Sequence, residues 1–288
     1  MTGLSEETLR AFSRDGCAVV DGFLSEAEVG ELRQRIGELL DEFDPSVHKA
    51  VEFETGTGTQ YFFDSADKVS YFLESGSNKE VNKIGHGLHI VEPVFRNLTH
   101  GSRVRRIAEQ LGYRDPRVLQ SMVICKQAGV GGAVPMHQDS TFLFTEPMSA
   151  CGFWLALEDC TQSNGCLEFV PGSHRSAPLE RRFVRTCDDT GTEMVAVEPP
   201  VRDSYLPRLQ TEQQQESRHA ECVPVEVKAG ALVLIHGQVL HKSARNSSAR
   251  SRWIYTFHIV DGECKYDGRN WLQMGGEAGL TRLEAPPL

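Results

Sequence analysis

The feature that most constrains the fold is a series of short, apolar, β-rich segments that begins at about residue 117. These segments span residues 118–125, 151–157, 165–170, 231–235 and 252–260. Gly, Pro, Asn and Asp separate them, and these residue types are typical of turns. Several short strands divided by turns predict a sandwich or a jelly roll, so we expect a mainly β fold with flanking α-helices.

The first 116 residues carry helical signals instead. Ser5 can cap a short helix, and Ser25 with Glu28 forms a capping box ahead of a second one. Apolar residues then recur at helical spacing between residues 24 and 40. A third helix is expected over residues 102–111, which a glycine follows.

These patterns predict a single domain, because 288 residues fit one large β-domain with helical additions. Within residues 1–288 we expect a helical N-terminal part (1–116), a jelly-roll core (117–262) and a C-terminal tail (263–288). Residues 177–222 are polar and interrupt the core. A long insertion of this kind is usually a lid or a binding loop, or else a disordered loop.

Composition restricts the partners and the compartment. The chain has 30 Lys and Arg against 40 Asp and Glu, a formal charge of −10, which disfavours nucleic acid and anionic membranes as partners. Its eight cysteines include no C-x-x-C pair and predict reduced thiols. The N-terminus has no apolar signal core, and no apolar run is long enough to span a bilayer. We therefore expect a cytoplasmic protein.

The run His137-Gln138-Asp139 is the first candidate for chemistry. On a strand, residues i and i+2 point to the same face, so His137 and Asp139 can present an imidazole and a carboxylate side by side. His241, at the end of an apolar strand, offers a second imidazole. Such a facial triad leaves three coordination positions open, which suits non-haem iron(II) and O2 chemistry. Zinc also takes three protein ligands and a water, so a zinc-dependent, cupin-like hydrolase or isomerase is an alternative.

Arg252 is the second candidate. Residues 244–249 have turn character, and a hairpin about their centre would pair residue 241 with 252 and residue 243 with 250. Cross-strand partners share a face, so Arg252 and Ser243 would lie beside His241. A metal with open positions next to a guanidinium suits a dicarboxylate, one end chelating the metal and the other pairing with the arginine. This combination points to 2-oxoglutarate as a cosubstrate.

Together these motifs resemble the phytanoyl-CoA dioxygenase family. The matching features are residues 137–139, Trp154, the run NGCLEFVPGSH at 164–174, His241 with Ser243, and Arg252 eleven residues after His241. Shorter stretches at 82–89, 120–122 and 234–237 add to the likeness. The similarity extends from Leu9 to about Trp271, which is nearly the whole chain.

The resemblance implies a double-stranded β-helix fold and an iron(II)- and 2-oxoglutarate-dependent dioxygenase that uses O2. It implies that His137, Asp139 and His241 hold the iron and that Arg252 binds the cosubstrate. Positions that line the 2-oxoglutarate pocket in the family match Lys83, Met122, Trp154 and Ser243. Gln138 also matches a site position, although strand alternation would turn its side chain away from the metal. Halogenating relatives have a small residue in place of the carboxylate, so Asp139 favours hydroxylation.

The substrate is expected to be a small organic molecule rather than phytanoyl-CoA. An acyl-CoA carries several negative charges and a long apolar tail, and the best basic cluster that could receive it is Arg181, Arg182 and Arg185. A non-catalytic, ligand-binding relative is the remaining alternative.

Four further histidines need an assignment. His86 and His89 could reach the substrate pocket, because they follow Lys83. His174 follows a turn and is expected to bind the backbone. His236 lies five residues before His241, on the opposite face of a regular strand, and is not expected to be a ligand.

Overall fold

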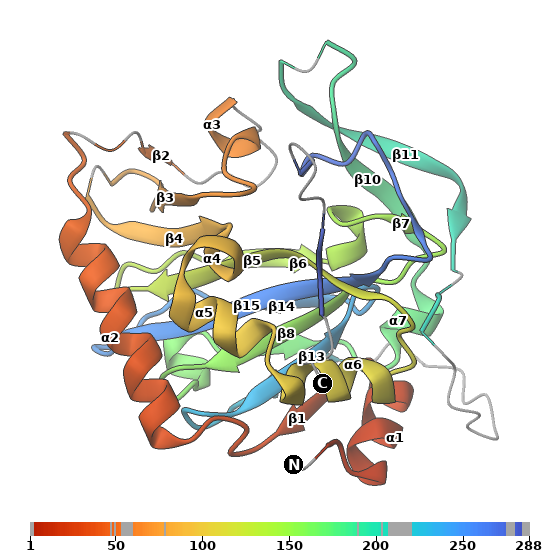
Figure 1. The fold of residues 1–288 in the computed structure, drawn as a ribbon, viewed down its shortest axis with the longest axis horizontal. Coiled ribbons are helices and arrows are strands. Elements are labelled where there is room, and N and C mark those ends of the chain that lie inside the picture. The colour runs from red at the N-terminus through yellow and green to blue at the C-terminus, as the bar shows by residue number, and fades with distance from the viewer. Residues whose placement is uncertain are drawn as a thin grey trace, which may run out of the picture.

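The computed structural model describes residues 3–46, 48, 50–52, 60–77, 79–188, 190–202, 204–206, 221–274 and 280–283. A nine-stranded sheet forms its framework (Figure 1). The strands run in the order β1 (Cys17–Val20), β13 (Leu232–His236), β8 (Cys151–Ala156), β15 (Arg252–Asp261), β5 (Pro116–Lys126), β4 (Val81–His86), β3 (Val69–Leu73) and β2 (Ala50–Glu52), and β17 (Thr281–Arg282) also pairs with β5. All of these pairings are antiparallel except that of β2 with β3.

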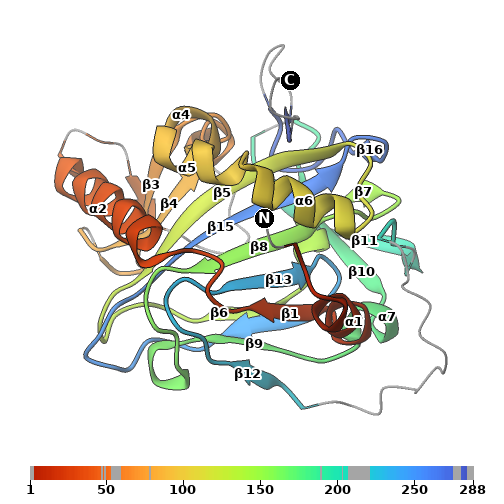
Figure 2. The ribbon, with the colours of Figure 1, turned by 60° about the horizontal axis from the view of Figure 1, so that its bottom comes forward.

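A smaller sheet of four strands packs against this framework. Its order is β12 (Val223–Val225), β9 (Leu167–Phe169), β14 (His241–Ser243) and β6 (Val134–His137). Figure 2 shows β9 and β12 below β1 and β13. A cavity lined by residues of both sheets lies between them. Two sheets with a cavity between their facing surfaces are the architecture of a cupin-like jelly roll, as the strand pattern predicts.

Helices cover the other face of the large sheet. They are α1 (Glu6–Asp15), α2 (Glu26–Glu42), α4 (Leu88–Val91), α5 (Pro93–Thr99) and α6 (Ser102–Gln110). Figure 1 shows α2, α4, α5 and α6 in front of the sheet. Ser5 caps α1, and Ser25 with Glu28 forms the expected capping box on α2. The three predicted helices are therefore confirmed.

Strand alternation divides the large sheet between core and cavity. On β15, Tyr255 and Phe257 pack with the helices in the main hydrophobic core. Arg252, Thr256 and His258 on the same strand line the cavity instead. The position of a residue along its strand thus decides whether it stabilises the fold or faces the site.

Residues 1–116, expected to be helical, also supply β1 to β4. β1 pairs with β13, and β4 pairs with β5, so this part extends the sheet at both ends. The sequence signal for these four strands was weak because they have three to six residues each. Short apolar runs cannot be assigned from periodicity alone.

The polar insertion at 177–222 contains a β-hairpin of β10 (Leu179–Arg185) and β11 (Thr192–Val201). It borders the cavity opposite α3 (Gln60–Phe63), whose Phe62 also lines it (Figure 1). The remaining short elements are η1 (Asp139–Thr141), β7 (Thr145–Glu146), η2 (Gln162–Asn164), α7 (Ser173–Ser176) and β16 (Lys265–Tyr266). Residues 207–220 of the insertion lie outside the described residues.

All eight cysteines are free thiols, as predicted. None of the helices in the described ranges combines the length and hydrophobicity that crossing a bilayer requires.

Candidate metal and cosubstrate site

Two imidazoles and a carboxylate converge where β6 and β14 face each other. His241 pairs with His137 across these strands, and their ring centroids are 4.2 Å apart. β6 ends at His137, so Asp139 starts the following η1 turn rather than continuing the strand. Its Oδ1 nevertheless lies 3.4 Å from Nε2 of His137 and 3.6 Å from Nε2 of His241. One ligand atom of each residue lies within 4.8 Å of the others, which is compatible with binding a single metal ion.

The backbone sets the tautomer of both rings. Nδ1 of His137 lies 2.8 Å from the carbonyl oxygen of Pro135, and Nδ1 of His241 lies 3.0 Å from that of Val239. A carbonyl can accept but not donate, so each Nδ1 carries the proton and donates it. The lone pair is then on Nε2, the atom that faces Asp139. Ligand rings in metal sites are commonly oriented in this way.

His258 is a member of the site that the sequence analysis missed. Its Nε2 lies 3.1 Å from Oδ2 of Asp139, the oxygen that does not face the two other histidines. Nε2 of Gln120 lies 3.4 Å from Nδ1 of His258. An ionised carboxylate accepts only, so His258 donates from Nε2 and thereby holds the orientation of Asp139. Strand alternation is the signal that could have identified it. His258 follows Arg252 by six residues on one strand, and an even separation places both side chains on the same face.

The charges of the cluster favour metal ligation. Burial opposes ionisation of Asp139, but its interactions with His241, His258 and His137 outweigh burial and hold its pKa well below the usual value. Burial lowers the pKa of His241 to about 4, and the neighbouring His137 adds to this effect. For His137 burial acts in the same direction, but the Asp139 carboxylate outweighs it and raises the pKa. The set therefore presents an ionised carboxylate and, at His241, a neutral imidazole, the forms that bind metals.

Arg252 occupies the other end of the cavity and is 1% exposed. Its guanidinium lies over the Trp154 ring, 5.6 Å from the centroid, and its Nε has no hydrogen-bond partner. No carboxylate among the described residues forms an ion pair with it. Burial lowers its pKa. A buried charge without a counter-ion is costly, so this guanidinium needs a partner from outside the chain.

The hairpin predicted to join His241 to Arg252 is wrong. β14 pairs with β6 and β9, whereas Arg252 pairs with Lys126 on β5 of the large sheet. Residues 244–251 cross from one sheet to the other, and the Asn246 side chain holds the crossing by donating to backbone carbonyls of Lys126, Gln127 and Arg250. His241 and Arg252 still meet, because each lines the shared cavity from its own sheet.

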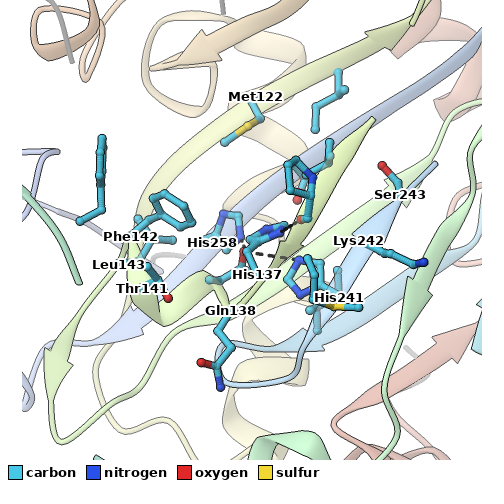
Figure 3. A pocket seen from close by; sticks show the side chains of 18 of the residues that line it. Met122, His137, Gln138, Thr141, Phe142, Leu143, His241, Lys242, Ser243 and His258 are labelled. Atoms are coloured by element: carbon cyan, nitrogen blue, oxygen red, sulfur yellow. Dashed lines mark hydrogen bonds and ion pairs between the residues drawn. The ribbon is translucent and has the colours of Figure 1, made fainter. Parts of the chain in front are cut away.

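The remaining predicted site residues also line this cavity, which has a volume of about 820 Å³. Lys83 reaches it from β4, Met122 from β5, Trp154 from β8 and Ser243 from β14. Figure 3 shows Met122 and Ser243 near the His137–His241 pair. Burial lowers the pKa of Lys83 to about 7.

Gln138 differs from the other predicted site residues in the direction of its side chain. Its side-chain amide donates to the carbonyls of Ala177 and Gln238, at 3.1 and 2.8 Å. Figure 3 shows it pointing away from His137 and His241, as strand alternation predicts. Its contacts tie the triad strand to neighbouring loops.

The other histidines separate into one that lines the cavity and three that do not. His86 lines it. His89 does not line it, and its Nδ1 lies 2.8 Å from the hydroxyl of Ser121 on β5. His174 contacts the Ser13 carbonyl through Nε2, which confirms a backbone contact. His236 contacts Ser204 and is not part of the metal cluster in the described residues.

A family model described as phytanoyl-CoA dioxygenase matches residues 12–254. The chain belongs to the phytanoyl-CoA dioxygenase family. It is 39% identical to phytanoyl-CoA dioxygenase domain-containing protein 1 of Rattus norvegicus over 100% of this chain and 99% of that protein. It is 40% identical to a phytanoyl-CoA dioxygenase of Arabidopsis thaliana, with 94% of each covered. These coverages place the whole jelly roll and its N-terminal helices within the family.

Solved structures of more distant proteins share the fold of this family member. EctD from S. alaskensis, crystallised with 2-oxoglutarate and 5-hydroxyectoine, matches with a TM-score of 0.66 at 21% identity, over 96% of this chain and 86% of that one. The epimerase SnoN from nogalamycin biosynthesis, in complex with Fe3+, α-ketoglutarate and nogalamycin RO, matches with a TM-score of 0.64 at 19% identity, over 97% and 98%. The jelly-roll fold is thereby confirmed.

Proposed function

We propose that this member of the phytanoyl-CoA dioxygenase family is an iron(II)- and 2-oxoglutarate-dependent dioxygenase that hydroxylates a small organic substrate and releases succinate and CO2. One observation carries the proposal. A buried arginine without a counter-ion and a His-Asp-His cluster line the same cavity. A dicarboxylate that also binds a metal would satisfy both.

His137, Asp139 and His241 suit iron(II) by their chemistry. Two imidazoles and a carboxylate on one side of an ion leave three positions for other ligands. When bound, the metal would supply the oxidative chemistry with 2-oxoglutarate and O2. SnoN and EctD, whose structures hold iron, α-ketoglutarate or 2-oxoglutarate, share this fold and support the assignment.

The polar end of the cavity suits 2-oxoglutarate. Arg252 presents a planar guanidinium that can pair with the far carboxylate through two parallel hydrogen bonds. Ser243 and Lys83 offer further donors to the same ligand. Trp154 packs against the guanidinium and restricts its movement. The β10–β11 hairpin borders the opening, where it can limit access of water to the reacting groups.

A zinc hydrolase on the same fold would use the same three ligands, but it would have no need for a buried arginine without a counter-ion. The test is metal analysis combined with an assay of succinate formation from 2-oxoglutarate. We expect iron(II) to support turnover of 2-oxoglutarate and zinc(II) to inhibit it. Hydrolytic activity with zinc and no affinity for 2-oxoglutarate would overturn the proposal.

We further propose that the substrate is not an acyl-CoA. Arg182 is already paired with Asp267 and Asn270, and Arg185 donates to the Trp271 carbonyl. Two of the three arginines of this basic cluster are therefore engaged in holding the hairpin, which leaves the exposed Arg181 alone at the cavity to meet the several phosphates of an acyl-CoA. Phytanoyl-CoA should not raise succinate formation above the rate without substrate, and hydroxylation of any acyl-CoA would contradict this part.

A further inference from the structure

His86 is a cavity-lining histidine that the metal and 2-oxoglutarate leave unused. A role for it in substrate binding rests on the proposed function, because it assigns the substrate side of the same cavity. His86 ends β4 and is enclosed by the rings of Phe62, Phe72 and Trp271, with centroids 5.5, 5.3 and 5.1 Å from its own. Phe62 and Trp271 also stack on each other at 4.1 Å.

The hydrogen bonds of Ser65 determine which His86 nitrogen carries the proton. The Ser65 hydroxyl lies 2.6 Å from the Phe62 carbonyl oxygen and 2.7 Å from Nδ1 of His86. The carbonyl can only accept, so the single hydroxyl proton is donated to it. Towards His86 the hydroxyl must accept, and Nδ1 is therefore protonated.

Nε2 of His86 is consequently an acceptor. It has no hydrogen-bond partner among the described residues, and the atom itself is not fully buried. It therefore remains accessible from the cavity that the ring lines. Burial, and then the charges of Lys83 and His258, hold the pKa of His86 well below its usual value. The ring thus stays neutral and offers a lone pair, which suits a hydroxyl or N–H donor and repels a carboxylate.

Glu74 and Lys126, two charged residues that also line the cavity, already have partners in the chain. Glu74 accepts hydrogen bonds from Asn82 and from the backbone N–H of Gly132. Lys126 donates to the carbonyls of Ser243 and Ala244. They are therefore poorly placed to orient a substrate.

The rest of the wall near the metal is apolar and largely aromatic. The Phe142 ring lies edge-on to His137 at 5.9 Å and contacts Phe183 of the hairpin at 5.4 Å. Phe142, Phe183, Phe62 and Trp271 belong to one hydrophobic cluster with Met194, and all five line the cavity. Aromatic rings together with a methionine suit a compact aromatic ligand.

We propose that the substrate is a compact, predominantly aromatic molecule with a hydroxyl or N–H group that donates to Nε2 of His86. His86 is then a specificity-determining residue. The apolar enclosure strengthens this hydrogen bond and penalises a ligand without the donor, because the lone pair would be left buried without a partner.

The probes are 2-naphthol and 2-methoxynaphthalene, which share a ring system and differ in the donor. Their dissociation constants for the protein loaded with Mn(II) and 2-oxoglutarate are measured by ligand-observed NMR under air-free conditions. We expect 2-naphthol to bind at least about tenfold more tightly, the discrimination that one buried hydrogen bond provides. Equal binding of the two probes, or binding of neither, would overturn the proposal.

The variant His86→Phe keeps an aromatic ring and removes the acceptor, so it should abolish the preference. His89→Phe is the matched control, because His89 is equally buried but does not line the cavity, and it should keep the preference. A preference that survives in His86→Phe would contradict the assignment. If His86→Phe does not fold, 15N chemical shifts of the wild-type ring decide instead, since a protonated Nε2 would also contradict it. Binding of 2-oxoglutarate to the wild type is measured separately. If the wild type does not bind it, the result counts against the proposed function rather than against the role of His86.

Discussion

The two ends of the cavity differ in how their buried polar groups are satisfied. At the metal end, Nδ1 of His137 and of His241 donates to a backbone carbonyl, and His258 holds the outer oxygen of Asp139. At the arginine end, Nε of Arg252 has no partner, and no described carboxylate forms an ion pair with the guanidinium. The chain thus completes one end itself and leaves the other to be completed by a ligand.

This difference means that the two ends would bind their ligands by different means. The triad is oriented before a metal arrives, because its hydrogen bonds come from the fold. The buried guanidinium instead destabilises the empty protein, and a carboxylate ligand relieves that cost on binding. Affinity for the dicarboxylate should therefore include the relief of the cost of a buried charge that has no counter-ion in the apoprotein.

The strongest test of the metal end is removal of its ligands. His137→Ala, Asp139→Ala and His241→Ala should each abolish iron binding and 2-oxoglutarate turnover while the fold is retained, because two remaining ligands cannot hold the ion. Metal titration and circular dichroism measure both properties. Asp159→Ala, which removes a surface ion pair with Lys228, is the control and should behave as wild type. Full activity in any triad variant would remove that residue from the metal site.

The arginine end should respond in the opposite way. Arg252→Ala should weaken 2-oxoglutarate binding by about 2–5 kcal/mol, since one side of a buried charged pair is lost. Arg252→Lys should rescue poorly, because the planar fork is absent. Calorimetric titration measures both. Wild-type affinity for 2-oxoglutarate in both variants would show that Arg252 does not bind the cosubstrate.

The thermal stability of the apoprotein also tests whether Arg252 lacks a counter-ion. Arg252→Met should raise the melting temperature of the apoprotein, because it removes a buried charge without a counter-ion. Arg182→Met is the matched control. That arginine is paired with Asp267 and stacked on Phe144, so its loss should lower the melting temperature. A destabilised Arg252→Met variant would indicate that the chain itself supplies a partner.

The contribution of His258 should be smaller. His258→Leu removes the donor to Asp139 and should reduce metal affinity by about 10–100-fold, the usual effect of losing a partner of a metal ligand. His258→Gln can place an amide N–H near the same position and should recover part of the affinity. Equal affinities in the two variants would mean that His258 acts through packing alone. Binding of Co(II), followed by its visible absorption, reports ligand geometry independently of activity.

The smallest effect concerns pH. Burial lowers the pKa of Lys83 to about 7 from the ordinary lysine value of 10.5, so between these values the unfolded chain binds more protons at this residue than the folded one. The contribution of Lys83 to the free energy of unfolding therefore rises with pH from about 7 to about 10.5. Lys83→Met should flatten this part of the stability profile of the apoprotein, as measured by urea unfolding. An unchanged slope would show that Lys83 keeps an ordinary pKa in the folded state.

Much of the site could be predicted from residue types and local spacing. The triad residues, Arg252 and the capping residues Ser5 and Ser25 all carry signals within a few positions of themselves. The resemblance of the motifs to one family then indicated the jelly roll. What local spacing does not contain is the pairing between distant strands, and the predicted hairpin between His241 and Arg252 failed for that reason.

The sequence by itself determined which side chains are available and, through alternation, which of them share a face of a strand. The tertiary structure alone decided their partners. It separates His241 and Arg252 into two sheets and joins them across a cavity, and it brings His258 to Asp139 over 119 residues. It also places Ser65 where it fixes the proton on His86. The physical reason is that hydrogen-bond donors and counter-ions are assigned by contact in space, and packing of the whole core sets those contacts.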